Sequence, residues 1–137
     1  MNISFWSGEG QINPELFSIV AEKCAETICN DGLKGKKLEK NKISQLRKFY
    51  DEALRFKDLI KSGESIDDLL PYLKMLNAKA AYAEGRGLIT RNFTTMLKKC
   101  LEQVDSRNPQ SLEVFISFFE AFMGYYKYYE SQINKDR

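Results

Sequence analysis

Apolar residues recur along most of this chain at spacings of three and four positions, which is the period of a helix that buries one face. Asn13-Pro14 and Asn108-Pro109 are typical helix starts, because asparagine caps a helix N-terminus and proline fits its first turn. No segment alternates apolar and polar residues as a half-buried strand does. The pattern predicts an all-α fold, a compact five-helix bundle in one domain of residues 1–137. The expected helices span about 13–29, 42–62, 71 to 85 or 87, 90 or 92 to 105, and 108–134.

Two connections between these helices have a distinct composition. Residues 31–42, DGLKGKKLEKNK, hold five lysines and only two leucines, so we expect a mobile, lysine-rich surface loop. Such a loop is more often a solvated linker than a binding arm, although its charge attracts a polyanion. Residues 65–68 are expected to form a short turn, with Pro71 opening the third helix.

The last predicted helix carries two apolar stripes, whereas one stripe is enough to dock a helix on its own domain. The second stripe consists of Val114, Phe118, Ala121, Tyr125 and Tyr128. A helix of this length is difficult to enclose on every side in a 137-residue chain. We therefore expect a protein–protein interface, with a fully internal helix as the alternative. The residues proposed for this interface are Val114, Phe118, Tyr125 and Tyr128.

The composition provides few groups for catalysis. The chain has no histidine, the commonest general acid or base at neutral pH and the commonest nitrogen ligand of transition metals. Its three cysteines form no Cys-x-x-Cys pair, and no phosphate-binding glycine motif is present. Asp67 and Asp68 are adjacent, so on a helix they diverge by about 100°. We expect no enzymatic activity, no metal and no cofactor.

The N-terminal residues resemble neither a secretory signal nor a membrane anchor. They lack a basic segment followed by a long apolar run, and no apolar run in the chain approaches the roughly 18 residues that span a bilayer. Together with the odd number of cysteines, this predicts a cytoplasmic protein with no membrane contact.

The charge is nearly balanced, with 21 Lys and Arg against 19 Asp and Glu. A free-standing nucleic-acid binder is usually more basic, so any such role depends on a local patch or on many copies acting together. Lys57 and Lys79 fall within the apolar arcs of their helices. Each must extend to solvent, pair with a carboxylate or lie at a surface groove. Tyr72 and Tyr82 neighbour Lys79 in angle and are candidates for base stacking or for a hydrogen bond to a sugar.

Four stretches are distinctive beyond their periodicity: LRKFYD at 46–51, LPYLK at 70–74, AKAAYAEGR at 78–86 and FFEAFMGYYK at 118–127. In this order and at these spacings, they resemble the Csm small-subunit family, the small subunit of type III-A CRISPR effector complexes. The similarity covers about residues 43–129.

The resemblance implies a helical subunit without nuclease activity that takes part in antiviral defence. Several copies are expected to stack beside the backbone ribonuclease subunits and line the channel that holds CRISPR RNA paired to target RNA. The implied partners are these two RNAs, the backbone ribonuclease subunit, the large polymerase-like subunit and neighbouring copies of the chain. Because base pairing recognises the sequence, contacts to the RNA backbone suffice.

Matching positions imply RNA-backbone contacts from six basic residues. The helical period places Lys48 and Lys79 on different faces relative to the core, so one strand is not expected to meet all six. The six residues are Arg47, Lys48, Arg55, Lys74, Lys79 and Arg86.

Two alternatives to this interpretation stay open. Arg47 and Arg86 can instead pair with Asp51 or Glu84 as ordinary surface ion pairs. The whole chain can also be a helical protein–protein adaptor or a homodimer that uses the aromatic fifth helix and has no RNA role. Salt separates the two functions, since phosphate contacts weaken steeply as salt rises and an aromatic interface does not.

Overall fold

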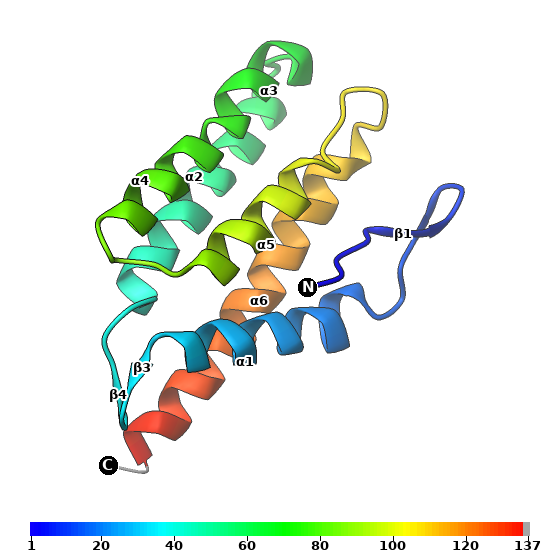
Figure 1. The fold of residues 1–137 in the computed structure, drawn as a ribbon. Helices are drawn as coiled ribbons and strands as arrows, with labels where there is room; N and C mark the ends of the chain where they lie inside the picture. The colour runs from blue at the N-terminus through cyan, green and yellow to red at the C-terminus, as the bar shows by residue number, and fades with distance from the viewer. Residues whose placement is uncertain (136–137) are drawn as a thin grey trace.

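The computed structural model describes residues 1–135, and residues 136 and 137 at the end of the predicted domain lie outside the described part. Helices dominate it (Figure 1). Only Met75 separates α3 from α4, so these two together occupy the third predicted helix, and the predicted five-helix bundle is confirmed. The elements are β1 (Trp6–Gly8), β2 (Gln11–Ile12), the π-helical turn η1 (Leu16–Val20), α1 (Ala21–Asp31), β3 (Leu33–Lys34), β4 (Lys37–Leu38), α2 (Ile43–Lys61), α3 (Ile66–Lys74), α4 (Leu76–Gly85), α5 (Arg91–Leu101) and α6 (Gln110–Lys135).

The long helix α6 is the centre of the bundle (Figure 1). It packs against α1 and α2, while α4 packs on α5 and α5 also touches α1. Aromatic rings fill the space between α2, α5 and α6. The Phe93 ring of α5 lies 5.3 Å from Phe49 of α2 and 6.3 Å and 6.2 Å from Phe119 and Phe122 of α6. All four are buried, and such ring pairs add about 0.5–1.5 kcal/mol each beyond the buried area.

Two of the three helix starts predicted from proline lie elsewhere in the structure, whereas α6 begins directly after Pro109. The Asn13 side chain accepts a hydrogen bond from the Glu15 N–H at 3.0 Å, as expected, but the following residues form η1, and regular helix begins only at Ala21. Helix α3 begins at Ile66 rather than at Pro71, because the Ser65 side chain accepts a hydrogen bond from the Asp67 N–H at 3.2 Å and caps it. The proline is inside α3.

The lysine-rich segment, expected to be a mobile surface loop, contains a short hairpin. Leu33 pairs with Leu38 across β3 and β4, and both side chains are half-buried. Gly35 in the turn has φ +64°, a conformation that glycine adopts without strain. The leucine pair and this glycine were the sequence signals for the hairpin.

Asn41, just after the hairpin, joins three parts of the fold. It is fully buried and has φ 57°. Its Nδ2 donates to the Ile28 carbonyl and to Thr90 Oγ1, both at 2.9 Å, and its Oδ1 accepts from the Thr90 N–H at 2.9 Å. Its backbone N–H donates to the Leu88 carbonyl at 3.0 Å, and its own carbonyl accepts from the Tyr126 hydroxyl. Every polar group of Asn41 is therefore hydrogen-bonded, and together they tie α1, the α4–α5 connection and α6.

The structure corrects part of the predicted interface on the last helix. Val114 and Phe118 are buried in the chain's own core, with 2% and 0% of their surfaces exposed. The Phe5 ring lies 6.5 Å from Phe118, and Gln103 fixes the N-terminal segment there by accepting from the Phe5 N–H at 2.8 Å. The N-terminal segment thus covers the second stripe at Phe118, which periodicity within the helix does not reveal. Of the four proposed interface residues, Tyr125 is half-buried and Tyr128 is 54% exposed.

Burial of the cysteines predicts a loss of stability at high pH. Burial raises the pKa of the Cys24 thiol from 9.0 to about 11 and also raises those of Cys100 and Tyr126. Because folding favours the protonated thiol, its contribution is complete below pH 9 and is lost as the pH rises through 11. We expect the urea midpoint of unfolding to fall between pH 9 and 11, and to fall less steeply in Cys24→Ala. An equally steep decline in the variant would contradict this assignment.

Candidate nucleic-acid interface

A surface groove of about 340 Å³ lies between α2 and α4. Phe49, Leu76 and Ala83 are buried residues along it and belong to the apolar faces of the two helices. The half-buried Leu88 and six polar or charged side chains complete its lining, the latter being Gln45, Lys48, Glu52, Lys79, Tyr82 and Arg86.

The groove brings together three of the six basic residues proposed to contact RNA, namely Lys48, Lys79 and Arg86. The expectation that Lys48 and Lys79 lie on different faces is therefore wrong. Helices α2 and α4 line the same groove, so residues at the edges of two separate apolar faces meet there. The period of each helix places a residue around its own axis, but it does not define the neighbouring helix.

Glu52 is the carboxylate of the groove, and two cations share it. Its Oε1 lies 2.7 Å from Nη2 of Arg55 and 3.7 Å from Nζ of Lys79. The hydrogen bond from Arg55, assisted by the charge of Lys79, lowers the pKa of the Glu52 carboxyl. The side chains of Arg55 and Lys79 are both 55% exposed. This ion pair holds Arg55 beside the groove. The spacing of three residues between Glu52 and Arg55 indicates such an ion pair from the sequence.

Arg86 and Tyr82 form the outer end of the groove lining. The Arg86 guanidinium carbon lies 5.6 Å from the centre of the Tyr82 ring, which fits a cation–π contact. The alternative pair between Arg86 and Glu84 is not found among residues 1–135, because Glu84 binds Arg91 instead, with Oε2 2.8 Å from its Nε. That hydrogen bond lowers the pKa of Glu84.

Arg47 and Lys74 lie outside the groove. Arg47 is exposed on α2, and no ion pair within 4.0 Å joins it to Asp51 in the described part of the chain. Lys74, at the end of α3, makes a small contribution to lowering the pKa of Asp105, for which the hydrogen bonds from Arg107 are the main cause.

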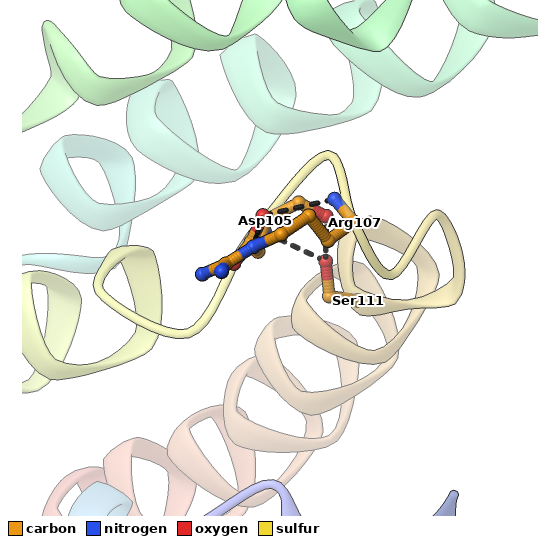
Figure 2. A network of polar contacts seen from close by, with 3 residues as sticks. All are labelled: Asp105, Arg107 and Ser111. Carbon is orange, nitrogen blue, oxygen red and sulfur yellow. Dashed lines mark hydrogen bonds and ion pairs between the residues drawn. The ribbon is translucent and has the colours of Figure 1, made fainter.

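Polar contacts among Asp105, Arg107 and Ser111 stabilise the connection from α5 to α6 (Figure 2). Arg107 Nη2 lies 2.7 Å from Asp105 Oδ2, and Ser111 Oγ accepts from the Asp105 N–H at 2.9 Å. Ser111 is buried at the first turn of α6. We interpret this network as a structural closure of the turn.

Lys57 lines a second groove, of about 440 Å³, between α2, the start of α3 and the start of α6. Its neighbours there are mainly apolar and include Ile60, Ile66 and Leu112. Lys57 is half-buried, so it occupies the surface groove that was one of its three expected environments.

Neither a metal-binding cluster nor a membrane-spanning helix occurs in the part of the chain that the structure describes. No group of three or more His, Cys, Asp or Glu side chains within 1–135 is arranged to hold a metal ion. Within the same range, no helix combines the length and the apolar character needed to cross a membrane.

Comparisons with known proteins agree with the resemblance noted from the sequence. The family described as Csm2 Type III-A matches residues 19–132, which is most of the chain. Neither the curated proteins nor the solved structures gave a match. The matched range includes the whole groove between α2 and α4. The chain therefore belongs to the Csm2 type III-A family, the small subunits of CRISPR Csm complexes.

Proposed function

We propose that this chain is a non-catalytic, RNA-contacting structural subunit of a type III-A CRISPR interference complex. Several copies stack along the duplex of CRISPR RNA and target RNA in the cytoplasm and bind its backbone without sequence specificity. One observation supports the proposal most strongly. In this member of the Csm2 family, Lys48, Lys79 and Arg86 line the same groove, in which Glu52 is the single carboxylate.

The groove suits phosphate binding and needs no base recognition. Lysine and arginine contacts to phosphates position a strand but carry no sequence information. With a net charge of +2, one copy binds RNA weakly. Copies that stack on one strand act as a multivalent binder, so a few contacts per copy are sufficient.

Protein partners complete the proposal. The chain contacts the backbone ribonuclease subunit, the large polymerase-like subunit and its own neighbouring copies. Tyr128, which is 54% exposed on α6, stays a candidate for one of these contacts, with the half-buried Tyr125 beside it. The adaptor alternative has less support, because Val114 and Phe118 lie in the chain's own core.

Charge reversal in the groove tests the RNA role. In assembled complexes, Lys48→Glu with Lys79→Glu should weaken target-RNA binding at low salt. The slope of the logarithm of the binding constant against the logarithm of the salt concentration should become shallower by about 1 per lost phosphate contact. The measurement is the dissociation constant across a salt series. Lys98→Glu, an exposed lysine of α5 that does not line the groove, is the matched control. Full-strength binding with an unchanged slope in the double variant, with folding intact by circular dichroism, would refute the proposal.

A further inference from the structure

Several large apolar and aromatic side chains within residues 1–135 are exposed, and Tyr82 has the largest exposed fraction among them, 68%. An exposed ring gains favourable burial when a partner covers its face. Arg86 lies over one part of the ring at 5.6 Å, one helical turn further along the chain.

The surroundings of Tyr82 favour an anionic partner. Lys48, Lys79 and Arg86 line the same groove, in which Glu52 is the single carboxylate. Glu52 lies near Lys79 and also binds Arg55. Protein interfaces are depleted of lysine at their centres, whereas single-stranded nucleic acids bind to grooves that combine cations with exposed aromatic rings. The groove volume of about 340 Å³ is sufficient for a small ligand group.

We propose that Tyr82 is a stacking platform for an unpaired RNA base whose neighbouring phosphates are bound by Lys48 and Lys79. This inference rests on the proposed RNA role and specifies its ligand: a nucleotide with its base out of the helix, not a continuous duplex. Bases inside a duplex are stacked on each other and offer no free face to a side chain. An exposed ring within a phosphate-binding groove thus gains a contact only where a base is unstacked.

The arrangement assigns separate roles to the side chains. The lysines attract the backbone and account for the salt dependence. The Tyr82 ring accepts the flat face of any base, because every base presents a π surface, so the site adds no sequence specificity. Arg86 holds the ring and extends the flat surface, since a guanidinium also stacks on bases.

Substitution of Tyr82 in assembled, guide-loaded complexes separates stacking from phosphate binding. The probe is a target RNA shortened until its dissociation constant is measurable. We expect Tyr82→Leu to weaken binding by roughly 5- to 150-fold, with the salt slope unchanged. Tyr82→Phe keeps the ring and should bind as the unmodified complex does. Phe17→Leu, at an exposed aromatic residue outside the groove, should have no effect on RNA binding.

Each other result overturns the inference. Unchanged affinity in Tyr82→Leu rules out stacking. Equal weakening in Tyr82→Leu and Tyr82→Phe assigns the contact to the hydroxyl, and a shallower salt slope in Tyr82→Leu assigns it to phosphate. Failure of Tyr82→Leu to enter the complex assigns the ring to a protein partner. If Lys48→Glu with Lys79→Glu changes the slope while Tyr82→Leu changes nothing, the RNA role stands and only the stacking site is lost.

Discussion

Replacing Phe118 with alanine is expected to lower the free energy of unfolding of the isolated chain by about 3–5 kcal/mol. The side chain is fully buried and its ring lies 6.5 Å from that of Phe5. Removal of the ring leaves a cavity between α6 and the N-terminal segment, which Gln103 holds in place. The measurement is urea unfolding followed by circular dichroism.

Tyr128→Ala is the matched control for Phe118, because it removes a large ring from the same helix at a position that is 54% exposed. We expect it to change the free energy of unfolding by less than about 0.5 kcal/mol. The decisive comparison is between stability and assembly. If Phe118→Ala kept full stability but lost subunit association, the side chain would belong to a partner interface and its internal position would be wrong.

Replacing Asn41 with alanine is expected to cost about 3–5 kcal/mol of unfolding free energy, although the residue belongs to a surface-like, lysine-rich segment. The change removes the partners of the Thr90 N–H and the Ile28 carbonyl. Buried polar groups without partners each cost about 1–3 kcal/mol. Alanine is also strained at φ 57°, by about 1–2 kcal/mol.

Asn41→Gly separates the two contributions, because glycine adopts this φ readily but provides no side-chain hydrogen bond. Its unfolding free energy should lie between those of the unmodified chain and Asn41→Ala. Tyr126→Phe tests the backbone carbonyl of Asn41, whose bond from the Tyr126 hydroxyl it removes. A loss below about 1 kcal/mol in Asn41→Ala would show that the network does not hold the fold together.

The long helices could be predicted with good accuracy because their signals are local. Helix α2, Ile43–Lys61, was expected over 42–62, and α6, Gln110–Lys135, over 108–134. Both combine a continuous apolar stripe with clear boundaries. The hairpin of β3 and β4 was missed, since strands of two residues are too short to produce alternation. Helix α3 begins at Ile66, before the start expected at Pro71, because the Ser65 side chain caps the helix there.

The candidate site likewise contains residues that the sequence could single out and one that it could not group with them. The resemblance to the Csm small-subunit family implied the six basic residues, and helical angle separately singled out Lys79 and its neighbour Tyr82. The period of α4 places Lys79, Tyr82 and Arg86 close together in angle. Lys48 could not be assigned to the same group. It lies on α2, 31 positions before Lys79, and nothing in either helix specifies how the two pack.

By itself, the sequence determined the helical class, the lack of catalytic histidine and the identity of the basic and aromatic residues. The tertiary structure alone decided that Lys48 and Lys79 share one groove and that Phe118 is internal. The physical reason is that periodicity describes a side chain relative to its own helix axis. Which surface covers that side chain depends on packing between distant segments, such as α2 with α4 or Phe5 with α6.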